Sequence, residues 1–423
     1  MARFVEVSVA YPIPHNWKWD SIGNYAKIKS GYPFDSEKFS DDPTGRQPLI
    51  RIRDILREST NTFTDECCPE EYIIHAGDIL IGMDGDFNVG KWNGDDALLN
   101  QRVCYIQSNS NCLLNDYLYY YLPGILKIIN NATPSVTVKH LSANTLRKTQ
   151  IPLPPLAEQQ RIVDRIESLF AKLDEAKEKA QAVVDSFEAR KAAILHKAFT
   201  GELTAKWREE HGVSIDNWKT TRFDSVAAIR SNLVDPAEYQ SFPHIAPDNI
   251  EKKTGVLLEY HTIAEDGVTS GKHRFYSGQI LYSKIRPYLS KAVVVDFDGL
   301  CSADMYPIEA YQNARCLWYY MLSDEFLLQA STAGSRSVLP KINQKELSAL
   351  TVHLPTNDRE QEEIARILDE LFDKEQQTKE AAEVVLDQID LMKKSILARA
   401  FRGELGTNDP SEESAVELLK QTF

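Results

Sequence analysis

One stretch of the chain has the spacing of a loop that binds phosphate or a metal ion. Gly85-Asp-Phe-Asn-Val-Gly-Lys91 fits GxxxxGK, the pattern in which backbone N–H groups and a lysine hold nucleotide phosphates. The next residue is Trp92, whereas such a loop needs a serine or threonine for Mg²⁺ and a helix for the anion. The overlapping DGDFN begins like a calcium loop, but Val89 stands where that loop requires glycine. Neither a nucleotide site nor a calcium site is therefore expected.

Other sequence patterns of catalysis do not occur. A methyltransferase would need a glycine-rich cofactor loop and an Asn/Asp-Pro-Pro-aromatic motif, and an α/β-hydrolase would need GxSxG. The nine histidines form no HxxxH, the six cysteines form no CxxC, and the adjacent Cys67 and Cys68 make a poor disulfide. We therefore predict no catalytic residue, no cofactor, no bound metal, and thiols suited to the reducing cytoplasm.

Basic residues instead gather in loops at equivalent places of two similar halves. MDGDFNVGKW follows GDILIG (77–82), KIRPYLSK follows GQILYS (278–283), and TPSVTVKH (133–140) matches GSRSVLPK (334–341). Arginine and lysine on short loops can reach guanine edges and phosphates in a major groove. Any soluble domain exposes such residues, so the prediction depends on their recurrence. Two of them are expected on a strand edge, in PLIRIRDI (48–55). The predicted DNA-contacting residues are Arg51, Arg53, Lys91, Arg102, Lys139, Lys284, Arg286, Lys291, Arg336 and Lys341.

The two halves are copies of one unit of roughly 200 residues, and such self-similarity defines the architecture of a chain. A shift of 202 positions lays AFTGEL (198–203) on AFRGEL (400–405), and a shift of 201 lays NWK (16–18) on residues 217–219. Within a unit, short apolar runs bounded by Gly, Asp, Asn and Pro predict strands. The YYYL and YYML segments predict short helices.

Each copy ends in a long helix. Apolar or small residues recur at alternating spacings of four and three from 162 to 198 and from 364 to 400, with Arg190 as the one break in the first stripe. This period keeps one stripe facing a partner helix over many turns. We therefore predict two rods of about 42 residues, each about 63 Å long at 1.5 Å per residue, paired antiparallel within the chain.

The charge balance argues against a chain that grips nucleic acid by itself. The formal net charge is −14, with the acidic excess mostly in the second long helix and the tail, while the globular segments are near neutral. Local basic loops are possible, but a strong electrostatic grip is not expected. No apolar run reaches 18 residues, and MARFVEVSVAYPIP does not read as a signal peptide.

The expected class is α+β: two mixed α/β recognition domains separated by two long antiparallel coiled-coil helices, with a pseudo-twofold internal repeat. The tail is expected to be a polar linker followed by a short amphipathic helix that docks. The predicted segments are 1–154 (first domain), 155–210 (first long helix), 211–355 (second domain), 356–405 (second long helix) and 406–423 (tail).

The segments around the long helices resemble a known family. IPLPPLAEQQRIV (151–163) opens the first helix, AFTGELTAKWREE (198–210) closes it, and SILARAFRGEL (395–405) closes the second. These resemble the conserved regions of specificity subunits of type I restriction–modification systems, in the family's order and over essentially the whole chain. The family pattern GELT-x-x-WR stands at 201–208 but is truncated in the second copy, where Gly406 follows GEL.

The resemblance implies a subunit that does no chemistry and binds double-stranded DNA. It also implies two modification subunits as partners, which methylate adenine with S-adenosylmethionine, and, through them, two ATP-dependent restriction subunits. Each domain would read one half of a bipartite sequence, and rods of about 63 Å would limit the separation of the half-sites to about 18 base pairs. Two alternatives remain: a free-standing nuclease or methyltransferase with a DNA-recognition domain, and a coiled-coil scaffold that never touches nucleic acid.

Overall fold

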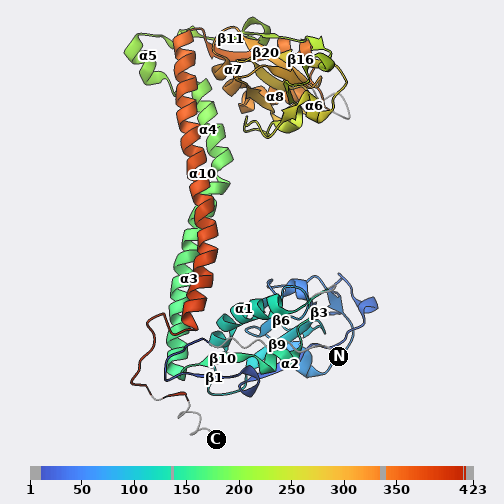
Figure 1. Cartoon of the computed structure of the whole chain (residues 1–423), viewed down its shortest axis with the longest axis vertical. Coiled ribbons are helices and arrows are strands. Elements are labelled where there is room, and N and C mark those ends of the chain that lie inside the picture. Colours follow the sequence, from blue (N-terminus) through green and yellow to red (C-terminus); the bar gives the residue numbers. More distant parts are fainter. Residues whose placement is uncertain (1–10, 135–137, 334–339, 413, 416–423) are drawn as a thin grey trace. The chain divides into compact units, whose positions relative to one another are not determined.

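The computed structural model describes residues 11–134, 138–333, 340–412 and 414–415. The chain forms two compact units, one made of Met1–Lys179 with Val385–Phe423 and the other of Ala180–Val384. Each unit holds one mixed domain and a stretch of each long helix (Figure 1). The five predicted segments stay a prediction, because these units cut across both long helices. The amphipathic helix expected in the tail falls largely in 416–423, outside the described residues.

The domain of the first unit contains two four-stranded sheets and an antiparallel strand pair. The first sheet has the order β2-β9-β6-β7 and is antiparallel throughout. The second sheet has the order β4-β3-β8-β5, with β3 and β8 parallel. The elements are β1 (Lys18–Ser21), β2 (Ala26–Ser30), β3 (Gln47–Ile50), β4 (Phe63–Thr64), β5 (Ile73–Ile74), β6 (Ile79–Gly82), β7 (Val89–Lys91), β8 (Ala97–Leu99), β9 (Val103–Ser108), α1 (Asn115–Ala132), α2 (Ala143–Lys148) and β10 (Gln150–Leu153), which pairs with β1.

The domain of the second unit repeats this topology. Its sheets have the orders β12-β20-β17-β18 and β13-β16-β19-β14-β15, so each strand of the first domain has a counterpart and β13 is an addition at one edge. The elements are β11 (Trp218–Arg222), β12 (Ala227–Ile229), β13 (Leu233–Val234), β14 (Pro243–Ile245), β15 (His261–Thr262), α6 (Ile263–Asp266), β16 (Lys272–Phe275), β17 (Ile280–Ser283), β18 (Ala292–Val294), β19 (Gly299–Cys301), β20 (Met305–Ala310), α7 (Ala314–Met321), α8 (Asp324–Ala333), α9 (Gln344–Ala349) and β21 (Thr351–Pro355). The predicted α+β class and the internal repeat are confirmed.

The main core of each unit joins its antiparallel sheet to the long helices. In the first unit, α1 buries Tyr117 and Tyr121 against Phe401, with ring centroids 5.1 Å apart in both pairs. The same core contains Ile162 and Ile166 from the stripe of the first long helix. Because large aromatic side chains contribute much of a core's buried area, α1 fixes the domain to the helices of its own unit.

The two long helices differ in continuity. α10 (Asp358–Ala400) is a single helix, as predicted, but the first copy is divided at Ser186 into α3 (Leu156–Asp185) and α4 (Phe187–Phe199). The prediction of one unbroken helix in the first copy is therefore wrong. The hydroxyl of Ser186 donates to the Ala182 carbonyl at 2.6 Å, and Arg190 Nη1 donates to the Val183 carbonyl at 3.2 Å. Side chains that take up helix carbonyls in this way compete with the backbone ladder.

Within each unit the paired helices run in opposite directions. In the first unit, Asp174 of α3 pairs with Lys393 of α10, and Lys177 pairs with Asp390. The partner's position on α10 therefore falls by three residues as the position on α3 rises by three. In the second unit Arg190 of α4 pairs with Glu375 of α10 at 2.7 Å. Among the described residues, no helix combines the length and the apolar character that crossing a membrane requires.

Candidate nucleic-acid interface

In the first domain, three segments far apart in sequence meet just beyond β6. Leu141 N–H donates to the Met83 carbonyl at 2.7 Å, and Met83 N–H donates to the Arg102 carbonyl at 3.0 Å. The carboxylate of Asp84 lies 3.1 Å from Arg102 Nη1 and 2.7 Å from His140 Nδ1. One aspartate thus ties together the loop after β6, the turn before β9 and the segment before α2. We call this arrangement the three-segment junction.

The second domain builds the same junction with the charges rearranged. Ile342 N–H donates to the Lys284 carbonyl at 2.9 Å, and Lys284 N–H donates to the Asp304 carbonyl at 3.0 Å, as in the first domain. The aspartate now lies on the turn before β20, where Asp304 is 3.1 Å from Lys341 and 4.0 Å from Lys284. The backbone arrangement is kept while the charged side chains change place.

Three predicted residues of the first domain line a single cleft of about 440 Å³. They are Arg51, Arg53 and Arg102. Phe39, Asn100 and Gln101 also line the cleft, so it offers guanidinium groups, an aromatic ring and amides. The prediction that the first two arginines lie on a strand edge is wrong, because they start a 3₁₀ helix (Ile52–Asp54) that follows β3. Arg53 Nη2 donates to the Thr62 hydroxyl at 2.8 Å, and the Arg102 side chain is 57% exposed.

The predicted lysines of the first domain have local partners. Lys139 Nζ donates to the Asn130 carbonyl at 2.7 Å and to its side-chain oxygen at 3.0 Å, which places a cation near the C-terminal end of α1. Lys91 pairs with Asp116 at the start of α1 and lies 5.7 Å from the ring centroid of Tyr119. Both lysines therefore hold α1 against the loops around it.

Two predicted lysines of the second domain are largely buried. The side chain of Lys284 is 16% exposed and donates to the Ala303 carbonyl, and that of Lys291 is 15% exposed and donates to the Pro247 carbonyl at 2.6 Å. Burial, with Lys341 nearby, lowers the pKa of Lys284. These two side chains brace the loops from inside, whereas Lys341 is about half exposed. Arg336 lies outside the described residues.

Arg286 combines exposure with an unusual backbone. Its φ of 49° and ψ of 60° place it in the left-handed region, where the equivalent position of the first domain is Gly85, with φ 76°. Non-glycine residues seldom adopt this conformation, and where they do it is a signal of function. The side chain is exposed and makes no hydrogen bond or ion pair within the described residues. Among the predicted residues that the structure describes, Arg286 is the one most free to reach a ligand.

Sequence reasoning missed two members of the first junction. In the sequence, Asp84 stands out only as part of a segment that fails as a calcium loop, and His140 is less conspicuous than the adjacent Lys139. A signal was present, because His140 occupies the position equivalent to Lys341, and each forms an isolated bridge to the loop after the central strand. The described residues hold no group of three or more histidine, cysteine or acidic side chains that could bind a metal ion.

Each long helix also begins at a buried carboxylate. Trp17 Nε1 donates to Glu158 at 2.8 Å in the first unit, and Trp218 Nε1 donates to Glu360 at 3.0 Å in the second. Both glutamates are fully buried. The neighbouring Gln159 is buried too and binds the backbone before α1. The sequence signal was the pair Glu-Gln at the same place in both copies.

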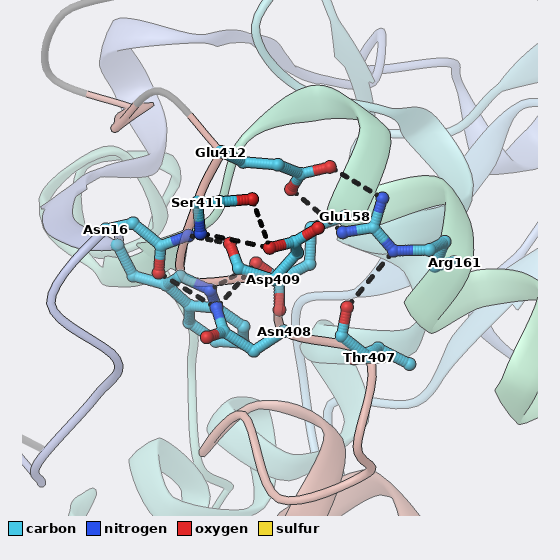
Figure 2. Close-up of polar contacts among 9 residues, drawn as sticks. Asn16, Glu158, Arg161, Thr407, Asn408, Asp409, Ser411 and Glu412 are labelled. Carbon is cyan, nitrogen blue, oxygen red and sulfur yellow. Dashed lines mark hydrogen bonds and ion pairs between the residues drawn. The ribbon is translucent and has the colours of Figure 1, made fainter.

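In the first unit the tail completes the surroundings of Glu158 (Figure 2). Asn408 Nδ2 lies 2.9 Å from Glu158 Oε2 and 2.8 Å from the side-chain oxygen of Asn16. Arg161 forms two 2.8 Å bonds to Glu412 and one of 3.1 Å to the Thr407 carbonyl. The polar part of the tail therefore packs on the first turns of α3.

In the second unit the corresponding bonds come from the segment after α4. Arg208, on α5 (Ala205–His211), donates to Glu360 at 2.7 Å, and the Thr204 hydroxyl donates to it at 2.8 Å. This segment is GELTAKWR, of which the second copy has a truncated form. The chain thus completes two equivalent carboxylates with different residues, a cation in one unit and an amide in the other.

Comparisons with known proteins agree on one family. A family model described as "Type I restriction modification DNA specificity domain" matches residues 14–184 and 215–385. The EcoDI specificity subunit of a type I restriction enzyme from Escherichia coli is 34% identical over 93% of this chain and 89% of its own length. The EcoBI specificity subunit, also from Escherichia coli, is 32% identical over 93% and 87%.

Solved structures share the fold. An HsdS subunit from Thermoanaerobacter tengcongensis aligns with a TM-score of 0.60 at 17% identity, covering 94% of this chain and 99% of that one. A chain from a structure on complex assembly and conformational transition of a type I R-M system aligns with a TM-score of 0.69 at 18% identity, covering 94% and 100%.

Proposed function

Because the chain belongs to the type I restriction–modification DNA specificity family, we propose that each of its domains reads one half of a bipartite duplex target. The chain carries the sequence recognition of a restriction–modification complex and has no catalytic role of its own. It binds two modification subunits, which methylate adenine, and through them restriction subunits. The long helices set the distance between the half-sites and dock the modification subunits. The complex works in the cytoplasm.

The observation that carries this proposal is the recurrence of the three-segment junction with different side chains. One scaffold presents an arginine-lined cleft in the first domain and an exposed Arg286 in the second. Arginine can bind guanine O6 and N7 through two hydrogen bonds, so a guanidinium on a rigid loop can select one base pair. Because the backbone is repeated, the chain has two domains that can each recognise a half-site. Because the side chains differ, the two domains recognise different base sequences.

The burial pattern divides the basic residues by role. Arg51, Arg53 and Arg102 line the open cleft, and Arg286 faces solvent, so we assign base or phosphate contacts to them. Lys341, whose side chain is about half exposed in the junction of the second domain, belongs to the same group. The better buried lysines, Lys91, Lys139, Lys284 and Lys291, support the loops from which the arginines project.

The net charge of −14 is compatible with this division of labour. Non-specific DNA affinity depends on how many phosphates a protein neutralises. A chain with few free cations can distinguish base pairs while its modification subunits supply most of the phosphate contacts. We therefore expect tight DNA binding only from the assembled complex.

The experiment uses the chain assembled with its modification subunit. Mapping methylated adenines identifies the target, and binding is then measured with the cognate duplex and with single-base variants. Arg286→Ala should weaken cognate binding by about 1–3 kcal/mol and abolish the preference at one base pair. Lys219→Ala, at an exposed position on β11, is the control. A loss equal over all sequences would make Arg286 a phosphate contact. Equal affinity of the assembled complex for cognate and scrambled DNA would favour the scaffold alternative.

A further inference from the structure

Besides its apolar contacts, helix α4 reaches a loop of the second domain with a buried lysine. Lys191 Nζ donates to the carbonyls of Lys253 and Thr254, at 2.9 and 3.2 Å. It also lies 5.4 Å from the ring centroid of Phe372 on α10. The side chain is almost fully buried, and burial lowers its pKa. Within the described residues, the hydrogen bonds of this buried cation go to carbonyls rather than to a carboxylate. Such burial is costly, so the position of Lys191 needs a reason.

The two carbonyls belong to a loop that is hydrogen-bonded to residues 286–290, which we call the Arg286 loop. Lys253 N–H donates to the Leu289 carbonyl at 3.1 Å, and Leu289 N–H donates to the Arg286 carbonyl at 2.9 Å. Lys191 and Lys253 also line a cleft of about 220 Å³ with Ser290. A continuous path of hydrogen bonds therefore runs from helix α4 to the backbone of the exposed arginine.

The same path contains most of the strained backbone of the described chain. Four non-glycine residues in the described ranges have positive φ: Phe87, Lys253, Arg286 and Ser290. Three of these lie in the loop that Lys191 contacts or in the loop hydrogen-bonded to it. Such conformations persist only where the surrounding contacts hold them. A change in those contacts should therefore alter the Arg286 loop before it alters the rest of the domain.

The equivalent lysine of the first unit has no such role. Lys393 occupies the corresponding place on α10 and lies 5.0 Å from the ring centroid of Phe170. Its ion-pair partner is Asp174, so both contacts are with α3. The lysine is thus a shared feature of the helix pairing, and in the second unit it has been redirected to a domain loop.

We propose that Lys191 is a positioning residue that joins helix α4 to the Arg286 loop. It thereby fixes the orientation of Arg286, the residue proposed to recognise a base pair in the second domain. This inference rests on the proposed function of Arg286. It assigns to the helix a part in base selectivity, beyond holding the domains at a distance. We expect the modification subunits to bind the helices. Their binding would therefore also act on Arg286 through this path of hydrogen bonds.

Hydrogen exchange on the full-length chain tests the coupling without DNA. Lys191→Met keeps the apolar contact with Phe372 and removes the donors, so amides of 253–255 and 286–290 should exchange at least several-fold faster. Lys393→Met, the matched control, should leave those segments unchanged. Lys191→Arg, which restores a cationic donor, should bring the rates back toward those of the unaltered chain. Unchanged exchange of both segments in Lys191→Met would overturn the proposal.

Binding by the assembled complex tests the effect on recognition. Lys191→Met should relax selectivity at the same base pair as Arg286→Ala, and the double variant should be no worse than Arg286→Ala alone. An equal loss on all sequences, adding to that of Arg286→Ala, would show a merely structural role and overturn the proposal. If Arg286→Ala left selectivity intact, the proposed function of Arg286 would fail, while the exchange rates would still decide the coupling.

Discussion

The indole Nε1 of Trp17 donates to Glu158 Oε2 at 2.8 Å, and this bond ties the start of the first domain to the first turn of α3. The second unit has the same tryptophan–glutamate bond, and Arg208 also donates to the glutamate there. In the first unit Asn408 takes the place of this arginine. A buried carboxylate held by a cation and one held by neutral donors differ in energy and in response to pH.

Loss of Arg208 should destabilise the second unit strongly. Glu360 is fully buried, and the Arg208 side chain is 10% exposed, so Arg208→Ala would leave a buried carboxylate without its cation. Breaking one side of such a pair costs about 3–5 kcal/mol. Urea unfolding followed by tryptophan fluorescence measures the change. Lys206→Ala on the same helix, where the side chain is 87% exposed, should change stability by less than about 0.5 kcal/mol. Equal effects of the two variants would contradict the assigned role of the pair.

Glu158 should make the first unit less stable as pH rises. Burial raises the pKa of Glu158 above its ordinary value. As pH increases, the unfolded chain therefore releases the Glu158 proton at a lower pH than the folded chain does. The free energy of unfolding falls until pH passes the raised pKa of Glu158 in the folded chain. Glu158→Gln removes that loss, so its unfolding free energy relative to the unaltered chain should increase over the range above about pH 4, near the ordinary pKa of glutamate. A difference that stays constant over this range would show that Glu158 does not titrate with folding.

Much of the fold could be predicted from the sequence, because the signals are periodic. The repeated motifs gave the two domains, and the heptad stripes gave the antiparallel helices. The break at Ser186 could not be read from the stripe, since it depends on side chains that take two carbonyls. In the sequence, Arg190 marks only an interruption of the stripe.

The site could be predicted only in part, because charge in a sequence does not reveal burial. Lys284 and Lys291 occupy the expected loops, but their ammonium groups point to carbonyls of their own domain. The ion pair between Asp84 and His140 joins residues 56 positions apart, and no local pattern marks it. The left-handed backbone of Arg286 was also hidden, since glycine marks that position only in the other copy.

The tail should contribute to the stability of the first unit through Asn408. Asn408→Ala removes its bonds to Glu158 and Asn16 and leaves a buried carboxylate less satisfied, at a cost of about 1–3 kcal/mol. Urea unfolding of the variant and of the unaltered chain, followed by tryptophan fluorescence, measures this loss of unfolding free energy. Ser411→Ala is the control, because its hydroxyl bonds only within the tail and is exposed. Wild-type stability of Asn408→Ala would mean that the tail packs there without stabilising the domain.

The distance between the half-sites should follow the length of the helices. Seven residues preserve the heptad stripe, so a heptad inserted after Lys179 and a second after Val384 would lengthen both helices at the division between the compact units. Each insertion adds about 10.5 Å at 1.5 Å per residue. At about 3.4 Å per base pair, the gap between methylated half-sites should grow by about three base pairs, while both half-sites keep their sequences. A heptad in α10 alone should leave both domains folded, as judged by circular dichroism, but abolish methylation of the original target. If the doubly lengthened chain directed methylation with the original gap, the helices would not set the spacing.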